Sequence, residues 1–169
     1  MRLFSVALIV FVSLFTLSQV LGQAKQDDRP PYYLTDAELD KKLKVDEKTE
    51  APSEYIWLIY FHRVPGCSTC QLMSKYIYET VEKSFADDVK GKNIVLRYRN
   101  LDDVKNADLV KRFNIRSPML VIVQVKDGKL VKAKHADKIW SLAAEKEKFL
   151  EYVEKEIKSY QPKSEEQKK

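Results

Sequence analysis

The stretch YIWLIYFHRVPGCSTC, residues 55–70, decides the fold of this 169-residue chain. Its first eight residues, 55–62, form a continuous apolar run, which is typical of a strand buried on both faces of a sheet. After a short loop, Cys67 and Cys70 stand three positions apart. From Leu72 the apolar residues recur with a helical period. The sequence therefore predicts a buried strand, then a loop, and then a helix that begins at the cysteine pair.

The remaining elements follow from the same patterns. One face of the predicted helix carries Leu72, Met73, Tyr76, Ile77, Thr80, Val81 and Phe85. Residues 94–99 alternate as a strand does, 104–113 form a shorter helical pattern, and 119–125 are a second apolar run. Asp127-Gly128 is a hairpin turn signal ahead of a lysine-rich edge strand at 130–134. Apolar residues between 139 and 157 predict a final helix or helix pair.

This order of elements predicts an α/β fold. The first two strands are joined by a helical crossover, so they should be parallel, and the last two should form an antiparallel hairpin. A central mixed four-stranded sheet with helices on both faces is the expected packing.

Three segments flank or precede this unit, which spans residues 54–160. Residues 1–22 are predicted to be a secretory signal peptide, because Arg2 precedes an apolar stretch of about 15 residues, short of the ~20 that span a bilayer. Residues 23–53 are polar, and the Thr35/Glu38 capping box predicts a short, peripheral helix from Asp36 to about Lys44, with Leu34 and Leu39 placed as a hydrophobic staple. Residues 161–169 form a charged tail that we expect to be disordered.

Composition and charge exclude several classes of protein. The chain is 44% hydrophobic and 33% charged, as folded soluble proteins are, and contains four glycines and six prolines. The net charge of +5 is spread along the chain, which argues against a nucleic-acid partner. Two cysteines cannot build a multi-bridge disulfide framework.

The cysteine pair carries the predicted chemistry. The N-terminus of a helix stabilises a thiolate, and thiols in Cys-x-x-Cys sites have lowered pKa values. We expect Cys67, on the outer side, to be the nucleophile and Cys70 to be the more buried resolving thiol. Two alternatives are an inert structural disulfide, whose four-residue loop would contribute only ~2 kcal/mol, and a zinc site with His62 and His135, which lacks a second cysteine pair. We predict no metal.

Other residues are candidates for the same site. His62 and Arg63 lie close before Cys67 and could tune its thiolate, although His62 could equally be a strand-end residue bonded to backbone. Pro118 directly precedes an apolar strand, which is where a proline is tolerated in a sheet.

The order of elements in residues 55–160 resembles the thioredoxin fold. It runs strand, Cys-x-x-Cys, helix, strand, helix, proline, hairpin and helix. In thioredoxins the proline before the third core strand is cis and faces the active-site disulfide, and Pro118 matches it. The resemblance implies that Ser117 and Pro118 flank the substrate groove beside Cys67. One departure is that thioredoxins carry a buried aspartate six residues before the first cysteine, where this chain has Phe61.

A closer resemblance rests on a few further short motifs, namely Tyr60-Phe61-His62, Cys67-x-Thr69-Cys70 and Lys138-Ile139-Trp140 leading into Phe149-x-x-Tyr152-Val153. They are similar to a bacterial thioredoxin-like family known as the ArsF-type subunit of nitrophenyl-compound nitroreductase. That resemblance implies a role in a nitro-compound reducing system, although the chain has no Gly-rich dinucleotide fingerprint of its own.

The sequence thus predicts a secreted or periplasmic thiol–disulfide oxidoreductase that needs no cofactor, because Cys67 and Cys70 carry the two electrons. Its partners would be protein or small-molecule disulfides or thiols and a redox partner, without a stable membrane anchor after signal cleavage. The alternative is a non-catalytic thioredoxin-fold binding or accessory subunit of a cell-envelope complex.

Overall fold

The four predicted strands are confirmed in the computed structural model, which describes residues 29–161. They form one mixed sheet in the order β2-β1-β3-β4. As expected, β1 pairs in parallel with β2 and β3 pairs antiparallel with β4. β1 also pairs antiparallel with β3. The strands are β1 (Glu54–His62), β2 (Ile94–Asn100), β3 (Met119–Lys126) and β4 (Lys129–His135).

Six α-helices and two 3₁₀ turns connect the strands within residues 29–161. They are η1 (Pro31–Tyr33), α1 (Asp36–Lys42), α2 (Ser68–Ser84), α3 (Ala86–Lys90), η2 (Val104–Asn106), α4 (Ala107–Arg112), α5 (Ile139–Leu142) and α6 (Lys146–Lys158). The C-terminal helical region is therefore a pair, α5 and α6. The predicted signal peptide and all of the predicted tail after Gln161 lie outside the described residues.

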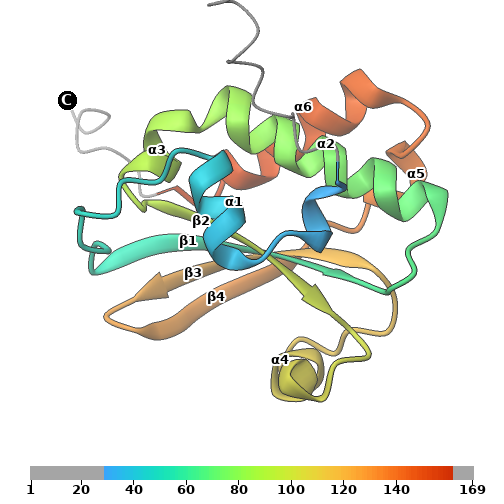
Figure 1. The fold of residues 1–169 in the computed structure, drawn as a ribbon, viewed down its shortest axis with the longest axis horizontal. Coiled ribbons are helices and arrows are strands. Elements are labelled where there is room, and N and C mark those ends of the chain that lie inside the picture. The colour runs from blue at the N-terminus through green and yellow to red at the C-terminus, as the bar shows by residue number, and fades with distance from the viewer. Residues whose placement is uncertain (1–28, 162–169) are drawn as a thin grey trace, which may run out of the picture.

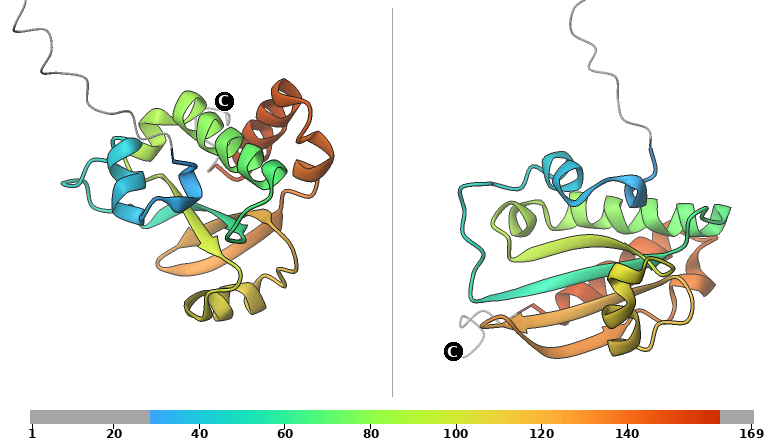
Figure 2. Two further views of the ribbon diagram at one scale, coloured as in Figure 1. Left: turned by 45° about the vertical axis from the view of Figure 1, so that its right-hand side comes forward. Right: turned by 60° about the horizontal axis from the view of Figure 1, so that its bottom comes forward.

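The helices cover the two faces of the sheet unequally. α2 and α6 lie across one face, with η1 and α1 in front of α2, whereas α4 lies on the opposite side of the sheet (Figures 1 and 2). The larger hydrophobic cluster fills the space under α2 and α6, and a smaller cluster lies on the α4 side. The predicted two-faced arrangement is confirmed.

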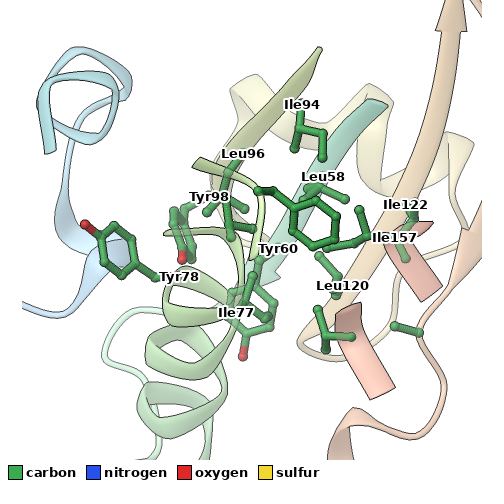
Figure 3. Close-up of a cluster of buried hydrophobic side chains, with 14 of the residues drawn as sticks. Leu58, Tyr60, Ile77, Tyr78, Ile94, Leu96, Tyr98, Leu120, Ile122 and Ile157 are labelled. Atoms are coloured by element: carbon green, nitrogen blue, oxygen red, sulfur yellow. The ribbon is translucent and has the colours of Figure 1, made fainter. Parts of the chain in front are cut away.

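Alternation along β1 decides which side chains reach which cluster. Leu58 and Tyr60 belong to the larger cluster, which Figure 3 shows between the sheet and the helices. Ile59 and Phe61 belong to the smaller one. All four side chains have 0% exposure, so the strand is buried on both faces, as its apolar run predicts.

The N-terminal segment is packed into the molecule more firmly than the expected peripheral helix. The Thr35/Glu38 capping box forms, and α1 ends at Lys42. Leu39 and Leu43 are buried in the main core, which ties the segment to the domain by the hydrophobic effect.

Ion pairs add to this attachment. Asp36 pairs with Arg99 at 2.9 Å and with Arg97 at 3.5 Å, and Asp40 pairs with Arg97 at 2.7 Å, so α1 is joined to β2 by three carboxylate–guanidinium contacts.

One residue of the predicted α2 core face is placed wrongly. Leu72 is 42% exposed, whereas its neighbour Met73 is fully buried. Successive residues of a helix are about 100° apart, so the buried stripe through Met73 and Ile77 leaves Leu72 outside it. The hairpin prediction holds, since Asp127 and Gly128 both have positive φ, as a type I′ turn requires.

Candidate active site

Cys67 and Cys70 form a disulfide at the N-terminus of α2, with their Cα atoms 5.0 Å apart. Cys67 is exposed and Cys70 is 5% exposed. The structure therefore places the outer and inner cysteines as the sequence predicts. An incoming thiolate or disulfide can reach the sulfur of Cys67, whereas that of Cys70 is shielded by the helix and the sheet.

The start of α2 favours negative charge on the outer sulfur. Cys67 is the N-cap residue, and its Sγ accepts a hydrogen bond from the backbone N–H of Cys70 at 3.1 Å. The first turn of α2 contains no acidic residue. After reduction, the partial positive charge of the helix end and this N–H would both stabilise a Cys67 thiolate.

Tyr60 is a member of the site that the sequence reasoning treated only as core. Its hydroxyl donates to the backbone carbonyl of Cys70 at 3.2 Å. Burial raises the pKa of Tyr60 well above its ordinary value, so the hydroxyl remains a neutral donor. Phe61, the residue found by counting six positions back from Cys67, belongs to the cluster on the α4 side. The residue directly beneath the inner cysteine is therefore a tyrosine.

Tyr98 makes a matching contact one turn further along α2. Its hydroxyl donates to the carbonyl of Ser74 at 3.1 Å, and its ring meets that of Tyr60 edge-on at 5.9 Å. Two strand tyrosines thus bind carbonyls one turn apart on α2, which fixes the depth of the helix over the sheet.

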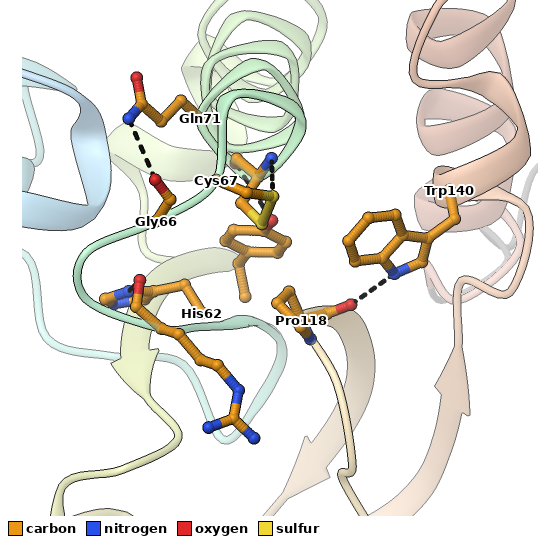
Figure 4. The surroundings of a disulfide bond; sticks show 9 residues. His62, Gly66, Cys67, Gln71, Pro118 and Trp140 are labelled. Carbon is orange, nitrogen blue, oxygen red and sulfur yellow. Dashed lines mark hydrogen bonds between the residues drawn. A yellow bond between two sulfur atoms is a disulfide. The ribbon is translucent and has the colours of Figure 1, made fainter.

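Pro118 lies beside the disulfide and is held by a tryptophan. Its carbonyl accepts a hydrogen bond from Nε1 of Trp140 at 2.8 Å, and Figure 4 shows Pro118 between Cys67 and Trp140. Pro118 is buried, Ser117 is exposed, and Trp140 is 39% exposed. These residues border the reactive sulfur on the side away from η1.

The cis geometry implied for Pro118 by the thioredoxin resemblance is not found. In the described part of the chain the one cis peptide bond is Val64–Pro65, in the loop before Cys67, so the Ser117–Pro118 bond is trans. Trans is the ordinary state of an X–Pro bond, and here the Trp140 indole holds the carbonyl that follows it.

His62 is directed into the protein, toward the N-terminal segment. The side chain is 3% exposed, and its ring packs on that of Tyr32 with 4.9 Å between centroids. Burial lowers the pKa of His62, which outweighs the raising effect of a contact with the Arg63 carbonyl. The hydrogen bonds described for His62 include neither cysteine, so its predicted effect on the thiolate stays a prediction.

Arg63 is engaged elsewhere. Its guanidinium pairs with Asp102 at 2.6 Å, and both side chains are about half exposed. This pair joins the loop before Cys67 to the segment after β2, and the tuning role predicted for Arg63 likewise stays a prediction.

The N-terminal segment reaches the loop of Cys67 through Tyr32. This side chain is 5% exposed, and its hydroxyl has no hydrogen-bond partner among the described residues. Burial raises the pKa of Tyr32 to about 12. A Cβ on Gly66 would lie 2.9 Å from that hydroxyl, and Gln71 Nε2 donates to the Gly66 carbonyl at 3.3 Å. Only a glycine fits at position 66 without displacing Tyr32.

Sequence reasoning missed Tyr32, Tyr60, Gln71 and Trp140 as parts of the site. Two signals could have pointed to some of them. Tyr60 lies on the same β1 face as Leu58, and Trp140 belongs to the apolar pattern that predicts the final helix or helix pair. Neither signal says which buried or half-buried side chain meets the cysteine loop.

Residues 29–161 contain neither a metal-binding cluster nor a membrane-spanning helix. No group of three or more His, Cys, Asp and Glu side chains there is arranged to hold a metal ion. None of the helices in that part of the chain has the length and apolar character to cross a membrane.

Comparison with known proteins gives matches among solved structures alone, since no family model and no curated protein matches the chain. Thioredoxin-2, a component of malaria parasite protein secretion machinery, is 20% identical over 60% of this chain and 92% of its own, with a TM-score of 0.35. Oxidised thioredoxin O2 from Arabidopsis thaliana is 18% identical over 69% of this chain and 90% of its own, with a TM-score of 0.36. The first two thioredoxin domains of Naumovozyma dairenensis Eps1p are 22% identical over 79% of this chain and 42% of theirs, with a TM-score of 0.38.

The topology itself identifies the architecture. The strand order is β2-β1-β3-β4, β1 is parallel to β2 and antiparallel to β3, and the disulfide caps the helix that follows β1. This topology, with the disulfide at the start of the helix after β1, is that of the thioredoxin fold.

Proposed function

We propose that this protein is a thiol–disulfide oxidoreductase in which Cys67 and Cys70 exchange two electrons with a substrate. The observation that carries the proposal is the asymmetry of the pair. The outer sulfur is exposed at a helix N-terminus, and the inner cysteine is 5% exposed beneath it. A purely structural disulfide needs no exposed member and closes here only a four-residue loop.

The exchange proceeds in two balanced steps when the pair is reduced. The Cys67 thiolate attacks one sulfur of a substrate disulfide, forms a mixed disulfide, and releases the other substrate sulfur as a thiolate. The Cys70 thiol then loses its proton and attacks the Cys67 sulfur, which restores the Cys67–Cys70 disulfide and releases the second substrate thiolate. Two electrons pass to the substrate, and the reverse sequence oxidises a substrate dithiol.

Three groups position these steps. The Cys70 N–H and the helix end favour the Cys67 thiolate. The Tyr60 hydroxyl holds the Cys70 carbonyl, and so keeps the inner cysteine beneath the outer one. The Trp140 indole fixes the Pro118 carbonyl at the rim of the exposed sulfur.

The test is exchange with hydroxyethyl disulfide, a small neutral substrate. We expect Cys67→Ser to abolish exchange, and Cys70→Ser to stop at a mixed disulfide visible by mass spectrometry. Alkylation of the reduced wild-type protein should modify Cys67 first, with a thiol pKa below the ordinary ~8.5. The proposal fails if reduced Cys67 reacts no faster than an ordinary cysteine of that pKa.

We further propose that the protein works outside the cytoplasm, because the predicted signal peptide at residues 1–22 precedes a chain with one cysteine pair. A role in a nitro-compound reducing system, as the ArsF-type resemblance implies, would need a partner that supplies electrons. The alternative of an accessory binding subunit predicts that a Cys67→Ala, Cys70→Ala double variant keeps its cellular function. Loss of function in a folded double variant would exclude it.

A further inference from the structure

A groove runs along the outer side of α2, between this helix and the N-terminal segment. It has a volume of about 650 Å³ and is lined on one wall by Arg29 and Lys42 and on the other by Ser68, Leu72 and Lys75. We call it the basic groove. Ser68 lies between the two cysteines in sequence, so the groove begins at the disulfide. Gln71, which also lines the groove, lies on the side of α2 away from Pro118 and Trp140 (Figure 4).

The basic groove offers a role for Leu72, whose exposure the sequence did not predict. This side chain is 42% exposed near the disulfide. Its apolar surface would be stabilised by transfer from water into a contact with another apolar group. Pro30 and Pro31 face it from the other wall. An occupant with aliphatic side chains would bury Leu72.

The charges of the groove favour an acidic occupant. Three cations, Arg29, Lys42 and Lys75, line it, and Glu82 is the one acid among the lining residues. Arg29 also pairs with Glu38, so three cations and two acids leave the groove and its edge with one net positive charge, and Lys42 lies over the ring of Tyr78. The N-terminus of α2 adds partial positive charge at the end nearest the disulfide. A cleft lined mainly by one sign of charge concentrates ligands of the opposite sign.

The length of the groove favours a peptide over a small molecule. From Ser68 to Glu82 the helix rises about 21 Å at about 1.5 Å per residue. An extended chain covers that distance with about six residues at about 3.4 Å each. The volume also lies within the ~300–1,000 Å³ range of binding sites.

We propose that the basic groove binds an acidic, partly aliphatic peptide segment of the protein substrate, which brings a disulfide in that segment to Cys67. The inference rests on the proposed oxidoreductase function and names the class of its substrate. Its chemistry is carried by Lys75 and Leu72 on one wall and by the cations of the N-terminal segment on the other.

Two kinds of peptide probe test the proposal. Each contains one cysteine carried as a mixed disulfide with 5-thio-2-nitrobenzoate, whose release is followed by absorbance. One set places a six-residue segment of alternating acidic and leucine residues before or after the cysteine. The matched set replaces each acid by lysine. We expect the reduced protein to react about tenfold faster with an acidic probe at low ionic strength, and the advantage to shrink with added salt.

Charge reversal in the protein supplies the second arm. Lys75→Glu should remove most of the preference for the acidic probe, and Leu72→Ser should slow both leucine-containing probes several-fold. Lys155→Glu, on the exposed side of α6, is the matched control and should leave the preference unchanged. The proposal is overturned if acidic and basic probes react equally, or if Lys75→Glu and Lys155→Glu have the same effect.

Failure of the groove and failure of the oxidoreductase function give different results. Hydroxyethyl disulfide is too small to span the groove, so the wild-type protein and the Lys155→Glu control should reduce it at the same rate if the function is right. If it is not reduced by any of them, equilibrium binding of a fluorescent, cysteine-free acidic peptide still tests the groove. Binding that Lys75→Glu weakens several-fold supports it, and binding that is absent or insensitive to Lys75→Glu overturns it.

Discussion

The contact between Tyr32 and Gly66 yields a sharp prediction about the loop before Cys67. Gly66→Ala adds one methyl group, whose carbon would lie 2.9 Å from the Tyr32 hydroxyl and 3.2 Å from the ring carbon that carries it. The Tyr32 ring is 5% exposed and cannot swing into solvent. Overpacking of this kind costs about 1–3 kcal/mol of stability. Alanine also stiffens the unfolded chain, which offsets about 0.4–1 kcal/mol of that cost. We expect Gly66→Ala to destabilise the protein by about 1–2 kcal/mol.

Removing the Tyr32 hydroxyl should reverse most of that cost. The hydroxyl is buried without a partner among the described residues, and such a group costs about 1–3 kcal/mol to leave unsatisfied. Tyr32→Phe should therefore stabilise the protein by up to about 1 kcal/mol. In the Tyr32→Phe background the nearest atom to the new Cβ is the ring carbon at 3.2 Å, so Gly66→Ala should cost about 1 kcal/mol less.

The assay is chemical unfolding of the oxidised protein, with the four members of the double-mutant cycle measured side by side. Gly91→Ala is the control, because its Cβ would meet no atom closer than 3.4 Å, and the stiffer unfolded chain should leave it as stable as the wild type or up to about 1 kcal/mol more stable. Exchange with hydroxyethyl disulfide should slow in Gly66→Ala and recover in the double variant, since Gly66 directly precedes Cys67. The reasoning is refuted if Gly66→Ala is tolerated as well as Gly91→Ala, or if the two changes at Tyr32 and Gly66 are additive.

Three further outcomes follow from the same site. Trp140→Phe keeps an aromatic ring but removes the donor to the Pro118 carbonyl, so it should slow thiol–disulfide exchange and cost about 0.5–1.5 kcal/mol of stability. An unchanged exchange rate would contradict the positioning role of Trp140. His62 has a pKa lowered by burial, so the unfolded chain binds its proton more readily, and stability should fall as the pH drops below about 6.5; His62→Phe should lack that part of the pH dependence in unfolding curves. Burial acts to raise the pKa of Asp36, but the Arg99 pair outweighs it and the net shift is downward. The Asp36–Arg99 ion pair should therefore hold above about pH 4 and be lost on further acidification. Its loss should appear as faster amide hydrogen exchange in α1. Asp36→Asn should show that faster exchange already at pH 7.

The sequence predicted the sheet well because its strands carry unambiguous patterns. The apolar run of β1 predicts a strand buried on both faces, and the Asp127-Gly128 turn predicts a hairpin. The helical crossover between β1 and β2 predicts their parallel pairing. The two cysteines also have the exposure that was expected, since the helix after the buried strand leaves its N-cap residue, Cys67, outside and turns Cys70, three positions later, inward.

The surroundings of the cysteines could not be predicted in the same way. Tyr32 is 35 residues from Cys67 in sequence, and nothing local says that it meets Gly66. Leu72 fits the helical period of the apolar residues in the sequence. Which side of α2 is buried, however, depends on how the helix lies on the sheet, and Leu72 lies outside the buried side. The donor to the Pro118 carbonyl is likewise remote, since it is the Trp140 indole, 22 residues away. Long-range contacts of this kind are set by tertiary packing.

The two edges of the sheet have a consequence for the behaviour of the protein at high concentration. A bare edge strand offers unpaired backbone groups on which another chain could add a strand, and the apolar β1 and β3 beside such edges would favour stacking into aggregates. Here the β4 edge carries Lys129, Lys132 and Lys134, whose mutual repulsion opposes pairing of two such edges. The β2 edge is instead joined to α1 through Arg97 and Arg99. We therefore expect that loss of the N-terminal segment would leave the β2 edge without these α1 contacts and favour self-association.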